Sequence, residues 1–305
     1  MTPRIFIFGA GYSGKAFAAT RPDPDIAIAG TTRSAQKFDG LERVGIEPFL
    51  FDGSSVSESL SARLRQTTHL IVSIAPEEAG EPVLMAARKK IVADMPELGW
   101  IGYLSTVGVY GDFSGGWVDE ASECRPVSRR SVMRVAAERE WLTLGREAGL
   151  PVAILRLSGI YGPGRNAFVN LVNGTARRLV KEGQVFNRIH VADIAGALWH
   201  LASLKRGGIF NVTDDLPAPP QDVVAYAAKR MGVAPPPEIP FDAARLSPMA
   251  RSFYGESKRV SNAAIKRAGY RFLHPDYFSA LDAMWGARNW AGEGGHDARS
   301  PMRTS

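Results

Sequence analysis

The stretch Ile5-Phe6-Ile7-Phe8-Gly9-Ala10-Gly11-Tyr12-Ser13-Gly14 decides the fold of this chain. Four apolar residues predict a buried strand, and a helical stretch at residues 15–20 follows the glycines. Gly9 permits a tight strand-to-helix turn, Gly11 lets the backbone approach a ligand without a Cβ, and Gly14 allows close helix–strand packing. The helix then presents free amides and a positive dipole end. The pattern predicts a turn that binds a pyrophosphate.

Apolar runs of strand length recur along the first half of the chain, at residues 5–8, 26–29, 47–51, 69–74, 100–104 and 152–157. The stretches between them are long enough for helices, and those at residues 82–95 and 130–146 carry apolar side chains at three-to-four spacing. Strands that alternate with helices in this way predict an α/β fold with a doubly wound parallel sheet. With the glycine-rich turn after its first strand, this is a Rossmann fold built to hold a dinucleotide.

The alternation decays beyond Gly164, where proline clusters at residues 217–220 and 235–240 interrupt short helices. We therefore expect residues 1–163 to form the dinucleotide-binding domain, with residues 188–204 packing back on it. A smaller C-terminal substrate-binding domain is expected from residues 164–187 and 205–285. Residues 286–305 are rich in Gly, Ser, Arg and Asp and predict a flexible tail.

The end of the second predicted strand indicates which dinucleotide is bound. NAD-binding proteins usually place an Asp or Glu here for the ribose 2′-hydroxyl. This chain instead carries Thr32, Arg33 and Ser34, and Arg33 is a planar donor able to clamp a 2′-phosphate. NADP(H) is the expected cofactor, with NAD as the alternative if Arg33 is an ordinary surface arginine of the loop.

Two further strand ends carry candidate cofactor contacts. Asp52, after the third strand, is placed to accept from an adenine amino group, although an Asp before Gly53 is also an ordinary turn residue. After the fourth strand, Ile74, Ala75 and Pro76 are small or apolar, which suits backbone that runs beside a cofactor.

Composition excludes several classes of protein. The 305 residues are 45% hydrophobic with a net charge of +6, and no basic run is interleaved with aromatics, so we expect no nucleic-acid partner. Cys124 stands alone, which excludes an internal disulfide and a cysteine-rich metal site, and we expect no metal. No apolar stretch approaches the roughly 18 residues that would span a membrane. We expect a cytoplasmic monomer or homodimer that acts on an unknown small molecule.

Three ordered segments resemble extended short-chain dehydrogenases and epimerases of the NAD-dependent epimerase/dehydratase superfamily. They are Leu-Ser-Thr-Val-Gly-Val-Tyr-Gly at 104–111, Arg-Leu-Ser-Gly-Ile-Tyr-Gly-Pro-Gly at 156–164 and Ile-His-Val-Ala-Asp at 189–193. The resemblance implies that the hydroxyl of Thr106 hydrogen-bonds a substrate oxygen. It also implies a Tyr-x-x-x-Lys pair, whose tyrosine acts as acid or base while the lysine lowers the tyrosine pKa and holds the nicotinamide ribose.

The chain departs from that pattern at residues 126–138. When its Ala-Ala-Glu at 136–138 is aligned with the family helix, Arg130 stands at the tyrosine position and Arg134 at the lysine position. Arg134 could hold the ribose as a fixed cation, but Arg130 cannot release a proton at any useful pH. This loss resembles the atypical YeeZ-like branch, as do the segments 108–112, 117–120 and 257–262.

The candidate catalytic residues are Thr106 and Tyr110, with Tyr110 or water relaying the proton. The alternative for Tyr110 is a structural or substrate-wall residue, and His190 is expected to be structural rather than catalytic. The residues expected at the cofactor are Gly9, Gly11, Tyr12, Ser13, Gly14, Thr32, Arg33, Ser34, Asp52, Ile74, Ala75, Pro76, Ser105, Arg134, Ser158 and Gly159.

Two classes of function remain open. The chain is either an NADP(H)-binding oxidoreductase or epimerase-like enzyme for a small carbonyl, alcohol or sugar-type substrate, or a non-catalytic NADP(H)-binding sensor or regulator. The retained hydroxyls favour the enzyme, and the replaced tyrosine and lysine favour the sensor.

Overall fold

The computed structural model describes residues 2–246, 251 and 253–292. Its centre is a parallel sheet of seven strands in the order β11-β7-β5-β4-β1-β2-β3. The strands are β1 (Arg4–Phe8), β2 (Ala27–Thr32), β3 (Ile46–Leu50), β4 (His69–Val72), β5 (Trp100–Thr106), β7 (Val152–Leu157) and β11 (Gly208–Val212). All neighbouring pairs run parallel, and β1 lies between β2 and β4. The predicted α/β Rossmann sheet is confirmed.

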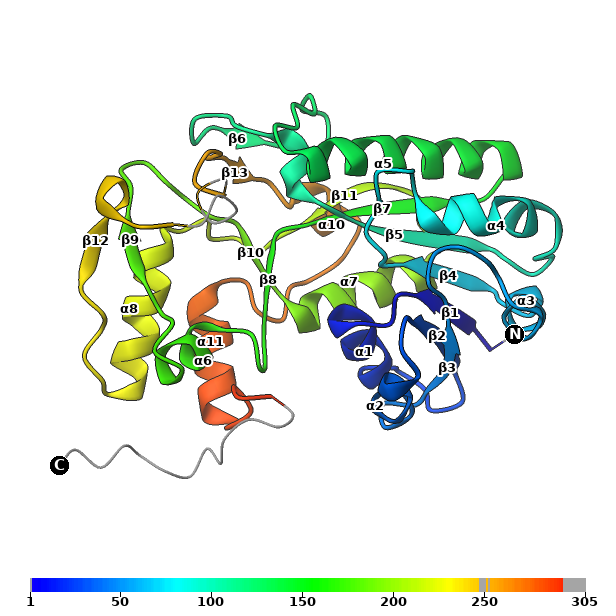
Figure 1. The fold of residues 1–305 in the computed structure, drawn as a ribbon, viewed down its shortest axis with the longest axis horizontal. Coiled ribbons are helices and arrows are strands. Elements are labelled where there is room, and N and C mark those ends of the chain that lie inside the picture. The colour runs from blue at the N-terminus through cyan, green and yellow to red at the C-terminus, as the bar shows by residue number, and fades with distance from the viewer. Residues whose placement is uncertain (1, 247–250, 252, 293–305) are drawn as a thin grey trace.

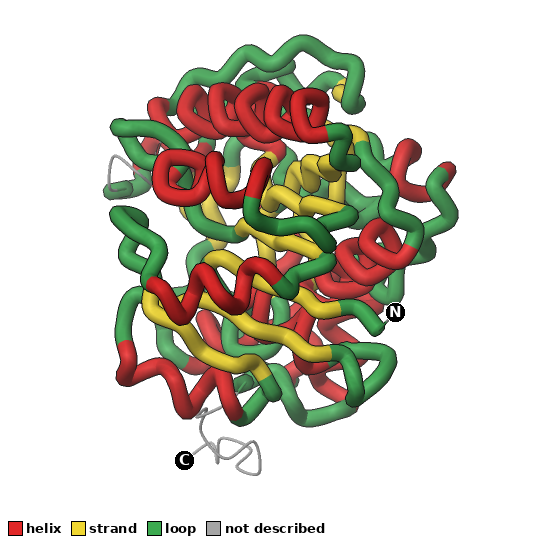
Figure 2. Tube along the Cα trace, turned by 90° about the vertical axis from the view of Figure 1, so that its right-hand side faces the viewer, coloured by secondary structure: helices red, strands yellow, loops and turns green. Residues whose placement is uncertain are grey.

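Helices cover both faces of this sheet (Figure 1). On one face lie α1 (Tyr12–Ala19), α2 (Phe38–Glu42), α7 (Val191–Ser203) and α10 (Ala263–Arg267), and on the other lie α3 (Glu58–Arg65), α4 (Pro82–Ala93) and α5 (Arg129–Ala148). Each layer has its own apolar core, because buried parallel strands present side chains to both faces. Figure 2 shows the strands stacked between the two layers of helices.

Local signals in the sequence start and stop several of these helices. The side chains of Ser57, Glu81 and Ser128 accept hydrogen bonds from first-turn amides of α3, α4 and α5, which satisfies donors that a helix start leaves free. Gly149 ends α5 at a φ of +64°, a left-handed conformation that glycine adopts without strain.

The remaining elements lie beyond the carboxyl ends of the sheet strands and form three small parallel pairs. These are β8 (Gly159–Tyr161) with β10 (Arg188–His190), β9 (Arg178–Val180) with β12 (Glu238–Pro240), and β6 (Trp117–Val118) with β13 (Arg259–Val260). The helices here are α6 (Ala167–Val172), α8 (Pro220–Met231), α11 (Tyr277–Gly286) and the short η2 (Val107–Tyr110). A separate apolar cluster joins α6, α8 and α11.

Two predicted boundaries differ from the structure. Residues 208–212, expected in the smaller domain, form the edge strand β11 of the main sheet, and Ile265 and Tyr270 pack into the sheet core. The amphipathic pattern of such short segments does not reveal which layer they join. The division into two domains otherwise stays a prediction.

The predicted tail begins too early. Residues 287–292 pack against the turn after β8, since Gly164 N and Asn166 Nδ2 both donate to the carbonyl of Trp290. The Trp290 ring lies 6.0 Å from that of Phe168, so an aromatic contact also holds this otherwise polar segment against α6. The rest of the predicted tail, 293–305, lies outside the described residues.

A substitution at Gly30 in β2 would test how tightly the centre of the sheet is packed. A Cβ at Gly30 would lie 2.8 Å from Ala10 Cβ and 3.2 Å from Ile7 O, so Gly30→Ala forces strand β2 or the glycine-rich turn to shift. We expect a loss of about 1–3 kcal/mol in the free energy of unfolding, measured by urea denaturation. Gly286→Ala is the control, because its Cβ would meet nothing within 4 Å. Equal stabilities of the two variants would contradict this packing.

Candidate functional site

The carboxyl ends of all seven sheet strands meet at one edge, as they must in a parallel sheet. Ligands of open α/β folds bind at this edge. The segments that follow β1, β2, β4, β5 and β7 carry nearly all of the sequence-predicted site residues, so the fold brings these groups to one region.

The glycine-rich turn after β1 fits a pyrophosphate. Gly9 has a φ of +82°, and a Cβ there would lie 2.8 Å from Ile74 Cγ1, so only glycine suits this approach of two strand ends. A Cβ on Gly11 would meet only Gly9 O, at 4.0 Å, which leaves the outer side of the turn open. A Cβ on Gly14 would lie 3.4 Å from Ile7 Cγ2, so this residue packs closely against strand β1.

The start of α1 leaves its amides available. Its N-cap Gly11 offers no side chain, and the first turn holds no acidic residue. Ser13 is buried in that turn, and Tyr12 extends from it so that its hydroxyl donates to Pro163 O at 3.0 Å. Burial raises the pKa of Tyr12 to about 12, against the opposing charge of Arg165, so its hydroxyl stays protonated as a donor.

The end of β2 presents a free cation at the same edge. Arg33 is exposed, while Thr32 Oγ1 accepts a hydrogen bond from Ser34 N at 3.4 Å. Within the described part of the chain, Arg33 takes part in no ion pair. Its guanidinium is therefore available to an anionic ligand.

The loops after β3 and β4 give weaker evidence for contact with a cofactor. Asp52 Oδ1 accepts from Ser54 N at 2.9 Å and from Ser54 Oγ at 2.7 Å, and these hydrogen bonds hold the pKa of Asp52 below its usual value. This is the turn role that was the alternative for Asp52. The segment 74–76 runs beside Gly9 with Ala75 exposed, and its contact with a cofactor stays a prediction.

A buried ion pair lies beneath the end of β5. Arg156 of β7 and Glu138 of α5 are 2.7 Å apart, with side chains 5% and 4% exposed. Ser105 Oγ donates to Glu138, and the Tyr110 hydroxyl accepts from Arg156 and donates to Asn211 Oδ1 at 2.7 Å. Burial works to lower the pKa of Arg156, but its bonds to Glu138 outweigh that effect and raise it.

This network bears on two predictions. Tyr110 is fully buried, burial raises its pKa to about 12, and its hydroxyl is engaged on both sides, so its side chain is not placed to relay a proton to a substrate. The hydroxyl of Ser105 donates to Glu138, and the role of Ser105 at a cofactor stays a prediction. Both side chains serve the internal network because the strand end turns them inward.

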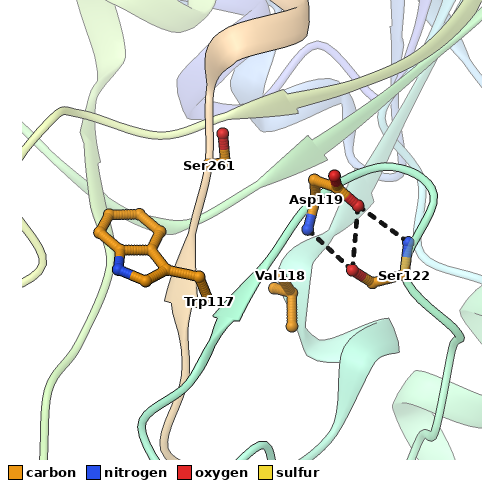
Figure 3. Close-up of a pocket in the computed structure, with 5 residues that line it drawn as sticks. All are labelled: Trp117, Val118, Asp119, Ser122 and Ser261. Carbon is orange, nitrogen blue, oxygen red and sulfur yellow. Dashed lines mark hydrogen bonds between the residues drawn. The ribbon is translucent and has the colours of Figure 1, made fainter.

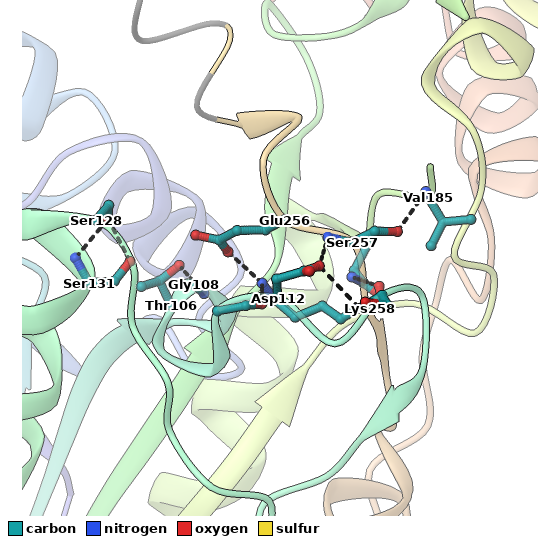
Figure 4. Close-up of polar contacts among 12 residues, drawn as sticks. Thr106, Gly108, Asp112, Ser128, Ser131, Val185, Glu256, Ser257 and Lys258 are labelled. Carbon is teal, nitrogen blue, oxygen red and sulfur yellow. Dashed lines mark hydrogen bonds and ion pairs between the residues drawn. The ribbon is translucent and has the colours of Figure 1, made fainter. Parts of the chain in front are cut away.

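Thr106 ends β5 at the open edge. Its Oγ1 accepts from Gly108 N at 3.1 Å and so caps η2. Ser131 of α5 lies beyond the same glycine, since a Cβ on Gly108 would be 2.9 Å from Ser131 Oγ and 3.4 Å from Thr106 Oγ1. Ser128 Oγ donates to Ser131 Oγ at 2.9 Å (Figure 4). Sequence reasoning missed Ser131, although it directly follows Arg130.

The two arginines at the expected tyrosine and lysine positions have different surroundings. Arg130 is exposed at the start of α5. Arg134 reaches back to β5, where its Nη1 donates to Leu104 O at 2.6 Å and to the Tyr103 hydroxyl at 3.0 Å. Strand β5 engages Nη1 of this guanidinium, and the role of Arg134 at a ribose stays a prediction.

Glu81, the residue before α4, is buried in the interior of the protein. It is 1% exposed, its Oε2 accepts from Leu84 N at 2.6 Å, and its Oε1 has no hydrogen-bond partner among the described residues. Burial raises the pKa of Glu81 to about 7, in spite of its helix-capping bonds. No local pattern in the sequence marks Glu81, because only tertiary packing buries it.

Ser158 and Gly159 follow β7 at the open edge. Ser158 is buried, and its Oγ finds no partner in the described chain, whereas Gly159 is exposed with its amide donating to Asn187 O. An unused buried hydroxyl at this edge fits a ligand with polar groups. The role of both residues at a cofactor stays a prediction.

His190 behaves as a structural residue. Its Nδ1 accepts from Ala192 N at the start of α7, and its ring packs edge-on against Tyr161, 5.4 Å away, and His274, 4.2 Å away. Burial lowers the pKa of His190 to about 3, so the ring is neutral near pH 7. This arrangement supports the structural alternative over acid–base chemistry.

Residues 256–258, which precede β13, brace the loop that follows Thr106 (Figure 4). Lys258, 6% exposed, donates from Nζ to Gly111 O at 2.6 Å and forms a 2.6 Å ion pair with Glu256. Ser257 N donates to Asp112 Oδ1 at 2.7 Å. The segment 257–262, noted for its resemblance to the YeeZ-like branch, thus supports one wall of the candidate site.

A shallow pocket lies between β6 and β13 (Figure 3). It is lined by Trp117, Val118, Asp119, Ser122 and Ser261. Asp119 Oδ1 already accepts from the amide and hydroxyl of Ser122, so the acidic group shapes its own turn. Within residues 2–292, apart from the gaps, no cluster of His, Cys, Asp or Glu could hold a metal ion. No described helix has the length and apolarity to cross a membrane.

The fold and this edge define a Rossmann protein with a dinucleotide-type site. The model of the NAD dependent epimerase/dehydratase family matches residues 79–213. Protein YeeZ of Escherichia coli K12 is 28% identical over 246 residues, which cover 76% of this chain and 85% of YeeZ. The chain is similar to the NAD dependent epimerase/dehydratase family over these residues, and the resemblance to the YeeZ-like branch is confirmed.

Solved structures share this fold. A conserved protein of unknown function from Silicibacter pomeroyi is 42% identical, with a TM-score of 0.85, over 94% of this chain and 99% of that one. Human epimerase family protein SDR39U1, solved with NADPH, shares the fold at a TM-score of 0.68 and 16% identity, over 92% of this chain and 98% of that one. Other structures of this fold contain NAD.

Glu81 makes folding depend on pH. Its folded pKa of about 7 lies above the usual 4.5, so the folded state retains a proton that the unfolded chain loses. The free energy of unfolding therefore falls as pH rises from about 5 to about 7, by at most about 3 kcal/mol for this group.

Denaturation in urea across that pH range, for wild type and Glu81→Gln, measures the effect. The variant keeps an oxygen for Leu84 N but has no proton to lose, so its stability should fall less steeply. Asp214, whose pKa burial raises to about 8, contributes to both curves and cancels in the comparison. Parallel curves would show that Glu81 titrates normally.

Proposed function

We propose that this protein is an NADP(H)-dependent oxidoreductase that acts on a small carbonyl, alcohol or sugar-type substrate. The observation that carries the proposal is the carboxyl edge of the sheet. There an uncapped helix start with no acidic residue, the open side of Gly11 and the unpaired Arg33 come together.

The residues present fit a phosphorylated dinucleotide. The amides of Tyr12, Ser13 and Gly14 at the start of α1 would hold the pyrophosphate, where the helix dipole favours negative charge. Arg33, with Thr32 and Ser34, would hold a 2′-phosphate through charge-assisted hydrogen bonds. Ser158 and Gly159 would line the nicotinamide end, where the buried Ser158 Oγ needs a partner. Human SDR39U1 was solved with NADPH and other structures of this fold with NAD, so Arg33 carries the choice between the two cofactors.

A nicotinamide cofactor supplies or accepts a hydride when bound. The hydroxyl of Thr106, at the end of β5, orients and polarises the substrate oxygen by hydrogen bonding, and the buried Ser131 hydroxyl lies near it beside Gly108. Tyr110 is buried away from this position, and water delivers the proton. Ser128 keeps the Ser131 hydroxyl oriented, because the two lie 2.9 Å apart.

A second candidate is an NADP(H)-binding sensor or regulator without turnover. The arginine at position 130 favours it, since Arg130 stands at the expected tyrosine position and cannot release a proton to a substrate. This candidate keeps the same cofactor edge and gives Thr106 no chemical role.

The cofactor assignment predicts that Arg33→Ala weakens NADPH binding by about 10- to 100-fold, the worth of a charged hydrogen bond, and leaves NADH binding unchanged. Titration of protein with each cofactor by nicotinamide fluorescence measures both affinities. Lys37→Ala is the control, because Lys37 is a nearby exposed cation in η1. Equal affinities of wild type for NADPH and NADH, untouched by the substitution, would refute the NADP(H) assignment.

The proposed role of Thr106 predicts that Thr106→Val lowers kcat/KM by on the order of 10²-fold, as loss of an oxygen-stabilising donor does, without weakening NADPH binding. The assay follows NADPH oxidation with a panel of aldehydes, ketones and sugar nucleotides. Thr106→Ser keeps the hydroxyl and the cap on η2 and should retain most activity. Full activity in Thr106→Val would remove this residue from the chemistry, and NADPH binding without turnover on any substrate would favour the sensor.

A further inference from the structure

The turn between β8 and α6 is a rigid platform. Gly162 and Arg165 exchange two backbone hydrogen bonds, each 3.0 Å long. Asn166, 7% exposed, donates from Nδ2 to Gly162 O at 2.8 Å and to Trp290 O at 2.7 Å, and Gly164 N also donates to Trp290 O. The backbone of this turn is thus held from inside the molecule, while Arg165 remains exposed.

The same turn packs against the start of α1. The Tyr12 hydroxyl donates to Pro163 O at 3.0 Å, although the two residues lie 151 positions apart in sequence. The fit is close, because a Cβ on Gly162 would come within 2.6 Å of the Tyr12 hydroxyl oxygen. The first turn of α1, where the pyrophosphate would bind, therefore has the 162–165 turn as its neighbour.

Arg165 brings an unneutralised charge to this place. Its charge acts on Tyr12, where it opposes the effect of burial on the phenol pKa. No acidic residue lies in the first turn of α1, and in the described chain Arg165 belongs to no ion pair. A cation beside a positive helix end is unfavourable unless an anion joins the two.

We propose that Arg165 binds the pyrophosphate of the dinucleotide, on the side opposite the glycine-rich turn. This inference rests on the proposed function and adds a contact from a segment that follows the last predicted cofactor residue. The planar guanidinium donates two parallel hydrogen bonds to phosphate oxygens, which a lysine cannot do. Tyr12 positions the platform by holding Pro163. Affinity for the cofactor thus depends on both halves of the chain.

Isothermal titration with three probes tests the assignment: NADPH, ADP-ribose, which has the pyrophosphate but no 2′-phosphate, and adenosine 2′-monophosphate, which has only the latter. Arg165→Gln should weaken NADPH and ADP-ribose by about tenfold and leave adenosine 2′-monophosphate unchanged. Arg33→Ala should weaken NADPH and adenosine 2′-monophosphate and leave ADP-ribose unchanged. The slope of log Kd for ADP-ribose against log salt should also fall in Arg165→Gln.

The matched control is Arg65→Gln, which removes one exposed arginine at the end of α3, at the amino edge of the sheet. It should bind all three probes as wild type does. Wild-type affinity of Arg165→Gln for ADP-ribose, or an equal loss for all three probes, would overturn the role of Arg165 while the proposed function stands. Failure of wild type to bind NADPH and NADH would overturn both proposals.

Discussion

The buried ion pair between Arg156 and Glu138 is the constraint on which the site region depends. Removing two charges from water costs several kcal/mol per ion, and only close geometry with further hydrogen bonds offsets that cost. Here the 2.7 Å contact between the two charges supplies the close geometry, and Ser105 and Tyr110 supply the further hydrogen bonds. The pair links α5 to β7, and through Ser105 and Tyr110 it also anchors the end of β5 and the turn that follows. Loss of one partner would leave the other charged and buried.

This arrangement gives Tyr110 a structural role in the interior and leaves Thr106 at the open edge, a difference that family resemblance alone does not reveal. Tyr110 lies only four residues beyond Thr106, yet its hydroxyl is part of the interior, whereas Thr106 ends its strand at the open edge. Arg134 likewise turns inward to Leu104. The Thr106 hydroxyl stays at the edge and can orient a substrate oxygen, but it carries no charge. Binding at this edge is therefore better supported by the structure than proton transfer.

The candidate cofactor edge is assembled from distant segments. The glycine-rich turn and Arg33 come from the first 33 residues, whereas the platform at 162–165 is braced by Asn166 and by residues near Trp290. Tyr12 joins the two across the edge. Because the platform depends on the far end of the described chain, changes in the C-terminal elements can alter an N-terminal binding site without touching it.

The sequence by itself determined the Rossmann sheet, because buried parallel strands and covering helices leave a strong pattern and the three glycines of the 9–14 turn leave a local one. It also located the strand ends, and so most of the candidate edge. It could not place β11, whose five residues carry no pattern to distinguish a sheet edge from a satellite strand. Only the tertiary structure decided which polar groups face inward. The burial of Tyr110 and Glu81, and the contact of Tyr12 with Pro163, arise between residues far apart in sequence, which no local pattern records.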